Sequence, residues 1–538
     1  MIALWALWAC TGEPSERTCL AGHGSQAEAS LDGDVALWAP SPTQVPLAWR
    51  FEAPTTGPVC ATLSVDDGTG PRTVASAGAT EDVALPLLGL RADSMVEVSW
   101  TLTDTLDRLV DEGTLSFDTP PLPERFPRFE ILAHDRARMP DGHVLFDVKN
   151  PKAEAPEGEE PEPIAAYLVV LDQDLEVIWW FDAANKIGDV AITPEGLLMG
   201  LSGTNALVWD WFGEVQQTWR SNADATQETV VDAHDFHHEV VPMPDGSLWT
   251  LSYQVTPVAA YPDDYDNPET LGPAKDLEDS TAIRVLADGT VAELRAMSDV
   301  LDTTRIGFDS LDRIGKERSD WVHANGLALD PSDGGLLVSL RHQDAIAKLT
   351  AQGELDWIVG SHSGWSEPFQ DALLTPIGEL SWPYHQHAPK LDDDGTLWVF
   401  DNGAYGRTPY DDEDEDFVAE SRAVAYRIDP QARTVEQLFE YRDTLTGPLY
   451  APALGGVDPV PGTGDVLVSY GFLEDDGGES NQARGRGTKS VRLIQIHPDR
   501  PDEPVFDLGL YSLADQETEG WKSYRAEPIG LLWEIAGP

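Results

Sequence analysis

A short turn motif recurs six times in this chain of 538 residues and constrains its fold more than any other feature. Each copy is a turn rich in Pro, Asp and Gly followed by an apolar run, as in Met243-Pro244-Asp245-Gly246-Ser247-Leu248-Trp249. Such residues preset the dihedral angles of a tight turn, and the run after them suits a pleated strand, so each copy is predicted to be a β-hairpin. The six turn glycines are Gly142, Gly196, Gly246, Gly334, Gly395 and Gly464.

The spacing of these glycines predicts the architecture. They are 54, 50, 88, 61 and 69 residues apart, which gives each unit room for four strands and variable loops. Radial repetition of small antiparallel sheets protects strand edges without a layer of helices, and the chain shows almost no sustained 3.6-residue apolar period. We therefore expect an all-β fold, with a six-bladed β-propeller over residues 124–538.

The residues before this region predict a separate module. Residues 22–120 contain alternating apolar and polar runs at Leu47–Phe51, Ala61–Val65 and Val96–Leu102. Their spacing is typical of a small β-sandwich of the immunoglobulin or fibronectin type III kind. The segment Thr119–Pro123 is proline-rich and is expected to be a stiff linker.

Residues 1–21 are interpreted as a lipoprotein-type signal and tether. The apolar run Ile2–Ala9 ends at Cys10 in a sequence similar to a lipobox, which predicts a lipidated, exported protein in the periplasm or on the cell surface; a mis-assigned start codon is the alternative. No other segment is long and apolar enough to span a bilayer. Cys19 and Cys60 could then form a disulfide in an oxidising compartment, and two free thiols are the alternative.

Three segments carry six of the 12 histidines. They are His237-His238-Glu239, then Trp321-Val322-His323-Ala324-Asn325 with Arg341-His342, and finally His385-Gln386-His387 with Asp401-Asn402-Gly403. In a propeller, the strand before the first turn of a blade lines the central channel, so side chains at equivalent positions converge. The sequence therefore predicts a central histidine site.

Counting back from the turn glycines aligns the histidines. Eight residues back lie His134, His238 and His387, and His323 lies eleven back. Any one of them could be a hydrogen-bonded structural residue, and this interpretation is favoured for His134. Neighbours on a strand point to opposite faces, so the spacing favours His238 over His237 as the inward-facing residue.

The residue types indicate group transfer. Arg341 follows His323 by 18 residues, and its guanidinium offers a planar fork of donors for sulfate, phosphate or carboxylate oxygens. A bound metal cation would be repelled by it, and the chain has no HExxH or CxxC motif, so no metal is predicted. Neutral imidazole is a competent nucleophile, and a second imidazole can pass a proton to the leaving oxygen. The chain has no GxSxG elbow that would indicate a serine nucleophile. It also has no P-loop and no dinucleotide fingerprint, so no cofactor is expected.

Taken in order, the three segments resemble the bacterial arylsulfotransferase family. The resemblance rests on the His-His-acidic segment, on Trp-x-His-x-Asn leading to Ser339-Leu340-Arg341-His342, and on Gln386-His387 leading to Phe400-Asp401-Asn402-Gly403. Ser523-Tyr524-Arg525-Ala526 is similar to the closing segment of that family, and the similarity spans about residues 124–527.

The resemblance implies a PAPS-independent enzyme that moves a sulfuryl group from a phenolic sulfate ester to a phenol. His387 would be the nucleophile and would carry a transient sulfohistidine, which implies ping-pong kinetics. The sulfuryl oxygens and the leaving phenol would be held by His237 or His238, His323 and Arg341. Further substrate-binding candidates from the same segments are Asn325, His342, His385 and Asn402.

Other features leave alternatives open. His385 lies two residues before His387 and could compete for the nucleophile role. The acidic insertions 263–266 and 411–416 are interpreted as solvated loops rather than calcium sites. A channel that only binds a ligand, and a hydrolase or phosphoryl-transfer enzyme using the same site, remain competing functions.

The composition narrows the partners. A formal charge of −59 excludes a general nucleic-acid binder. It would also repel an anionic aryl sulfate, so Arg341 and the histidines are predicted to form a locally positive funnel. The N-terminal module is expected to be structural or to form a homodimer.

Overall fold

The computed structural model describes residues 29–150, 165–183, 187–224, 231–311, 313–314, 318–392, 394–443, 445–475, 488–512 and 520–535. Strands dominate this part of the chain. Its one α-helix is the four-residue α1 (Leu532–Ile535), and its four 3-10 turns are η1 (Asn222–Asp224), η2 (Met297–Asp299), η3 (Arg341–Gln343) and η4 (Phe369–Ala372). The prediction of an all-β fold is confirmed. Among the described residues no helix has the length and apolar character needed to cross a membrane.

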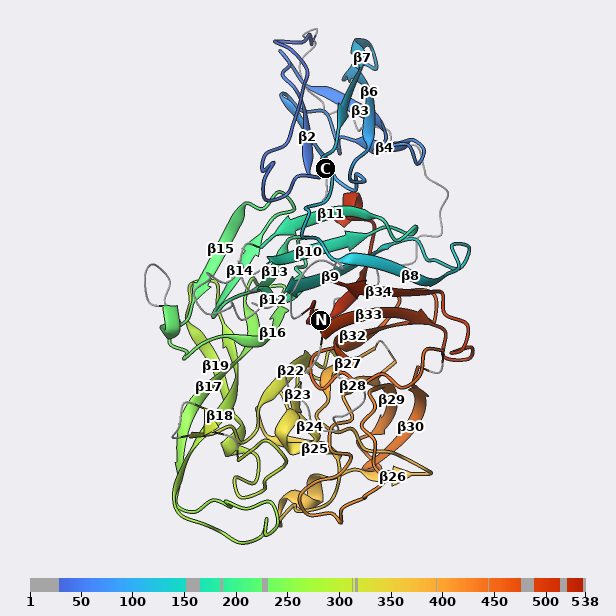
Figure 1. The fold of residues 1–538 in the computed structure, drawn as a ribbon. Coiled ribbons are helices and arrows are strands. Elements are labelled where there is room, and N and C mark those ends of the chain that lie inside the picture. Colours follow the sequence, from blue (N-terminus) through green and yellow to red (C-terminus); the bar gives the residue numbers. More distant parts are fainter. Residues whose placement is uncertain are drawn as a thin grey trace, which may run out of the picture.

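Two sheets form the N-terminal module, which lies at the top of Figure 1. One contains β1 (Ala36–Trp38), β2 (Trp49–Ala53) and β5 (Val83–Leu87), and the other contains β3 (Val59–Asp66), β4 (Arg72–Ala75), β6 (Met95–Asp104) and β7 (Leu109–Asp118). Both contribute to one apolar core that includes Phe51, Leu63 and Val98. Cys60 on β3 is disulfide-bonded. Cys10 and Cys19 lie outside the described residues, so its predicted pairing with Cys19 stays a prediction.

Six further sheets follow in chain order (Figure 1). The first contains β9 (His143–Asn150), β10 (Ala165–Leu171), β11 (Val177–Asp182) and β35 (Ala526–Ile529). The second contains β12 (Ile187–Ile192), β13 (Leu198–Ser202), β14 (Asn205–Trp209) and β15 (Val215–Arg220). The third contains β16 (His237–Pro242), β17 (Leu248–Val258), β18 (Lys275–Val285) and β19 (Val291–Ala296), with the short β20 (Arg313–Ile314) and β21 (Arg318–Ser319).

The remaining three sheets complete the set. The fourth contains β22 (Ala324–Leu329), β23 (Leu336–Leu340), β24 (Ala345–Leu349) and β25 (Leu355–Gly360). The fifth contains β26 (Thr375–Ile377), β27 (His387–Leu391), β28 (Thr396–Asp401), β29 (Arg422–Asp429) and β30 (Thr434–Tyr441). The sixth contains β31 (Gly456–Pro459), β32 (Val466–Asp475), β33 (Thr488–Ile496), β34 (Phe506–Tyr511) and β8 (Arg128–His134).

Five of the six repeated turns join two consecutive antiparallel strands of one sheet, as predicted. The turn at Gly142 does not, and the predicted hairpin there is wrong. The strand before it, β8, pairs with β34 in the sixth sheet, whereas β9 after it pairs with β35 from the C-terminus. The first strand after the N-terminal module thus completes the last sheet, and the C-terminal strand completes the first. His134 consequently lies on an edge strand, where its Nε2 is 3.0 Å from the carbonyl oxygen of Gln173.

The first strands of the sheets contact one another in succession. β12 contacts β16, β16 contacts β22, β22 contacts β27, β27 contacts β31, and β31 contacts β35. β9, which pairs with β35, in turn contacts β12. The predicted site residues therefore lie on or next to neighbouring strands, although 150 residues separate His237 from His387 along the chain.

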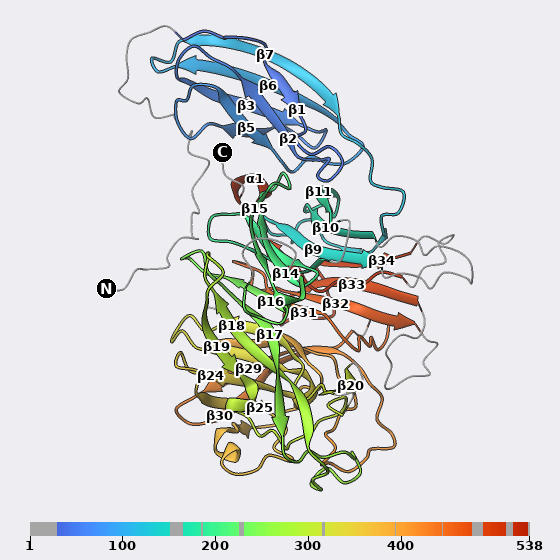
Figure 2. The ribbon, with the colours of Figure 1, turned by 90° about the vertical axis from the view of Figure 1, so that its left-hand side faces the viewer.

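The C-terminal helix lies between the N-terminal module and the first two sheets (Figure 2). The Leu532 amide donates to Nδ1 of His143 at 3.0 Å. The Trp533 ring packs against Gly89, where an added Cβ would lie 2.9 Å from the indole. Arg91 of the module also pairs with Asp172 and Asp174, at 2.5 Å each. The two parts are thus joined by packing and by ion pairs.

Candidate active site

Local irregularities of three neighbouring strands orient the histidines. The pairing of β16, β22 and β27 with their next strands shifts register within the first residues of each strand. His238 (φ 63°), His323 (φ 46°) and Ala388 (φ 49°) adopt left-handed backbone conformations there. Such bulges bend a strand and redirect side chains, which removes the strict alternation of faces.

His237 and His238 therefore lie together rather than on opposite sides of the strand. Their Nδ1 atoms are 2.7 Å apart, and their rings are perpendicular. The ring of His238, which the sequence favoured as the inward residue, lies 5.1 Å from the ring of His323. His237 contacts the site through His238.

Three further imidazoles, those of His323, His342 and His385, extend this cluster. The rings of His323 and His342 stack with centroids 4.6 Å apart, and the ring of His342 is 5.9 Å from that of His385. Side chains from the starts of three different sheets thus meet in one place.

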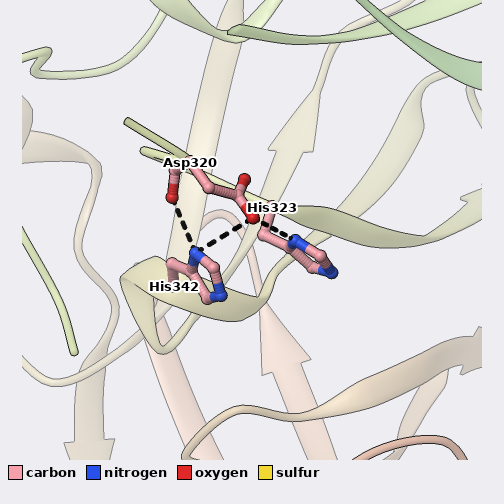
Figure 3. Close-up of side chains that lie close together, drawn as sticks. All are labelled: Asp320, His323 and His342. Atoms are coloured by element: carbon pink, nitrogen blue, oxygen red, sulfur yellow. Dashed lines mark hydrogen bonds and ion pairs between the residues drawn. The ribbon is translucent and has the colours of Figure 1, made fainter. Parts of the chain in front are cut away.

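Asp320 binds two of these histidines (Figure 3). Its Oδ2 lies 2.6 Å from Nδ1 of His323, and its backbone carbonyl oxygen lies 2.7 Å from Nδ1 of His342. Burial alone would raise the pKa of Asp320, but the nearby His323 and His342 outweigh it and hold this pKa below its ordinary value. The charged carboxylate of Asp320 therefore holds the ring of His323, and its backbone holds the ring of His342.

Asp320, His323 and His342 could also be considered as metal ligands, because one ligand atom of each lies within 4.8 Å of the others. The hydrogen bonds argue against this. Nη1 of Arg341 is 2.6 Å from Nε2 of His342, and a guanidinium can only donate, so Nε2 accepts and Nδ1 carries the proton. A metal would need a lone pair on one of these two nitrogens, and Nδ1 is protonated while Nε2 accepts from Arg341. The donor set fits a hydrogen-bonded network better than a metal centre.

His387, the first residue of β27, is 3% exposed. Its Nδ1 is 2.6 Å from Oδ1 of Asn402, whose amide nitrogen donates to the carbonyl oxygens of Ala451 (2.7 Å) and Leu454 (3.0 Å). The Asn402 oxygen must then face the ring, so Nδ1 of His387 carries the proton and Nε2 carries the lone pair. Burial, followed by the charge of Arg341, lowers the pKa of His387 well below its ordinary value.

His385 is fully buried, and both its nitrogens face carboxylates. Nδ1 is 2.8 Å from Oδ1 of Asp344, and Nε2 is 3.4 Å from Oδ2 of Asp309. Neither nitrogen offers a lone pair toward the site. Nε2 of His387, by contrast, carries a lone pair, which accepts a long hydrogen bond from the backbone amide of Leu454 at 3.3 Å.

The other predicted binding residues are bonded within the protein. The amide nitrogen of Asn325 donates to the backbone carbonyl of Gln386 at 2.8 Å, and the Asn325 backbone carbonyl accepts from the Tyr524 hydroxyl at 3.1 Å. Oδ1 of Asn325 is buried and has no hydrogen-bond partner among the described residues. Asn402 and His342 are committed to His387 and Arg341, as described above. These residues position the site more than they line it.

Sequence reasoning missed the acidic partners Asp309, Asp320 and Asp344. Asp320 could have been found, because it precedes His323 by three residues in the same motif. Asp309 and Asp344 stand in no recognisable pattern. It also missed the role of the closing segment, where Arg525 binds both oxygens of Glu239 at 2.7 Å and so fixes the His237-His238-Glu239 strand to the C-terminus.

Fold and site together define an all-β protein of repeated small sheets with a buried histidine and arginine centre at the starts of adjoining strands. Residues 160–510 match the family model of the arylsulfotransferases (ASST). The chain belongs to the arylsulfotransferase family.

Two curated relatives support this assignment. The arylsulfate sulfotransferases AssT of Escherichia coli O6:H1 and of Lelliottia amnigena are 26% and 28% identical to the chain over 407 residues. The alignment covers 65% of this chain and 66% of each relative, just under two thirds of their length. Among solved structures, a mutant Synechocystis apocarotenoid oxygenase shares 9% identity over 76% of this chain and 97% of its own, with a TM-score of 0.33. A luciferin-regenerating enzyme shares 12% identity over 75% and 97%, with a TM-score of 0.32. TM-scores this low do not establish a shared fold.

Proposed function

We propose that the protein is an aryl-sulfate sulfotransferase that transfers a sulfuryl group from a phenolic sulfate ester to a phenol by way of His387. The proposal rests on the tautomer of the His387 ring, that is, on which of its nitrogens carries the proton. Asn402 fixes the proton on Nδ1, which leaves the lone pair on Nε2. This lone pair accepts only a long hydrogen bond from the Leu454 amide, at 3.3 Å, and becomes the nucleophile when that bond breaks. We also infer that the six sheets are the blades of a β-propeller and that the site lies at its centre.

In the first half-reaction, Nε2 of His387 attacks sulfur, a nitrogen–sulfur bond forms, and the bond from sulfur to the aryl oxygen breaks. The leaving phenolate takes a proton from a neighbouring imidazole, and His323 suits this role because Oδ2 of Asp320, 2.6 Å from its Nδ1, orients the ring. Arg341 binds the sulfuryl oxygens, a task that suits a guanidinium. An acceptor phenol then reverses these steps, returning the proton to His323, so donor and acceptor bind alternately and the kinetics are ping-pong.

His385 does not share the nucleophile role in this scheme. Its nitrogens face Asp344 and Asp309, which suits a residue that holds the acidic partners in place. His238 faces His323 and can relay protons from His237, whose Nδ1 lies 2.7 Å from its own.

The domain organisation and the export signal are proposed as well, from the sequence patterns. Residues 22–120 form a β-sandwich domain, residues 124–538 form the catalytic propeller, and residues 1–21 are an export signal with Cys10 as a lipid anchor. A homodimer is a further expectation for the N-terminal domain. Mass spectrometry of the mature N-terminus tests the anchor directly.

A fluorogenic aryl sulfate, incubated with and without added phenol, tests the function. Phenol-dependent release supports transfer, release without phenol indicates hydrolysis, and no release leaves only a binding role. His387→Ala is expected to abolish turnover and to remove a sulfated histidine peptide detectable by mass spectrometry. His134→Ala, which changes a histidine on an outer strand, is the matched control and should turn over like the wild type. Full activity of His387→Ala would overturn the assignment.

A further inference from the structure

A carboxylate occupies the position where the proposed function needs an anion to bind. Asp309, in the loop after η2, accepts a hydrogen bond from Nη1 of Arg341 at 3.1 Å and from the hydroxyl of Tyr405 at 2.8 Å. Its Oδ2 also lies 3.4 Å from Nε2 of His385. A guanidinium, a phenol and an imidazole thus converge on one negatively charged group.

The loop that carries Asp309 is fixed in this place. An added Cβ at Gly307 would lie 1.9 Å from the backbone oxygen of His342, so only glycine allows the loop to approach the segment after Arg341 so closely. Arg305 donates to the backbone and side-chain oxygens of Gln343, at 2.8 and 3.0 Å. Asp309 itself has φ 67°, a left-handed conformation that is uncommon outside glycine. The position of the carboxylate is therefore a built feature of the fold.

The contacts of Asp309 change the electrostatics of the site. The negative charge of Asp309 compensates the positive charge of Arg341. Arg341 is the main cation of the locally positive funnel that the sequence predicted, so the funnel loses most of its charge. Burial would raise the pKa of Asp309, but His385, followed by Arg341 and His342, holds it below its ordinary value, so the group stays charged. An arriving sulfuryl group would meet a like charge at close range, which is repulsive in a partly buried site.

We infer that Asp309 is an internal competitor for the anion-binding site. Its carboxylate mimics a sulfuryl group, holds Arg341 and Tyr405 while no anion is bound, and withdraws when an oxyanion takes the guanidinium. The side chain of Asp309 is 15% exposed whereas that of Arg341 is 4% exposed, so rotation of Asp309 toward solvent frees the arginine without moving the loop. That Arg341 receives the sulfuryl oxygens of an aryl sulfate rests on the proposed function; the competition for oxyanions in general does not.

Inorganic sulfate is the probe that tests the inference without any turnover. Isothermal titration of the full chain with sodium sulfate, at constant ionic strength, should show binding at least about tenfold tighter for Asp309→Asn than for the wild type. Tyr405→Phe, which removes a hydrogen bond to Asp309 without changing charge, should tighten binding about two- to threefold. Arg341→Gln should abolish sulfate binding in both backgrounds.

The matched control is Asp302→Asn. Asp302 lies in the same loop and changes the net charge equally, but it bonds Thr304 and Ser366 rather than Arg341, so sulfate affinity should stay at the wild-type value. Equal or weaker sulfate binding by a folded Asp309→Asn variant would overturn the inference and make Asp309 a fixed support for Arg341. Tighter sulfate binding in a chain that fails to turn over aryl sulfates would retain the inference and reject the proposed function.

Discussion

Nδ1 of His387 lies 2.6 Å from Oδ1 of Asn402, and this contact decides which nitrogen of the ring can react. Two backbone carbonyls hold the Asn402 amide nitrogen, so the amide cannot turn over without losing both bonds. The side chain therefore fixes one tautomer of the histidine, in the way that a carboxylate orients the histidine of a hydrolase triad.

Asn402→Ala should lower kcat for aryl sulfate turnover by about 100-fold or more, because the ring loses its preferred tautomer and orientation. The yield of trapped sulfohistidine should fall in parallel. Asn222→Ala is the control, because it makes the same substitution at an exposed turn where the amide bonds Asp232. Near-normal turnover of a folded Asn402→Ala variant would show that another group sets the tautomer.

The acid side of the pH profile reports on His387. Because burial and Arg341 lower the pKa of His387, the reactive neutral form should persist below the ordinary histidine pKa of about 6.5. We expect kcat/KM for the donor to fall to half only at a pH below about 6.5. Arg341→Gln removes the neighbouring positive charge and should move this midpoint upward, in whatever activity remains. A wild-type midpoint above 6.5 would mean that His387 is not the group that titrates.

The sequence predicted most of the framework of the site but only part of its chemistry. The repeated turns place His238, His323 and His387 near the starts of strands, and the structure brings His238 and His323 into ring contact. Alternation along a strand suggested that only one of His237 and His238 would take part. The bulge in β16 was invisible in the pattern, because it depends on the pairing register with β17.

The electrostatic partners could not be predicted for a different reason. Asp309 lies 32 residues before Arg341 and reaches it through a loop whose path depends on Gly307 and Arg305. The exchange of β8 and β35 between the first and last sheets likewise depends on tertiary closure, so the repeat suggested a hairpin at Gly142 that does not form. Local motifs specify strands and turns; contacts between distant loops are set by the assembled fold.

Removal of metal ions should leave activity unchanged. The proton on Nδ1 of His342, set by the bond from Arg341 to Nε2, blocks the lone pair that a metal would need. Dialysis against a chelator, followed by turnover measurements with and without added zinc, is expected to change the rate by less than about twofold. A different outcome would establish a metal centre at Asp320, His323 and His342. In that case the wild type loses activity on dialysis and regains it with a divalent cation, whereas the Asp320→Asn variant does not regain it.

The buried carboxyl of Asp147 is expected to lower the free energy of unfolding as the pH rises. Its Oδ1 accepts from the backbone nitrogen of Tyr524 at 2.6 Å, while its Oδ2 is buried without a hydrogen-bond partner among the described residues. Burial raises the pKa of Asp147 to about 6. Above the unfolded value of about 3.9 the unfolded chain releases this proton more readily than the folded one, so the group costs stability as the pH rises and the cost is complete above about 6.

Asp147→Asn should therefore stabilise the protein at pH 8 by about 2–3 kcal/mol, the free energy that corresponds to a shift of about two pKa units, and should have little effect near pH 4. Denaturant unfolding at both pH values measures the difference. Asp416→Asn, an exposed position in the acidic insertion, makes the same change in net charge and should give no such pH dependence. If the two variants respond alike at pH 4 and pH 8, the gain reflects relief of the overall negative charge, and the buried carboxyl of Asp147 is ionised at no cost.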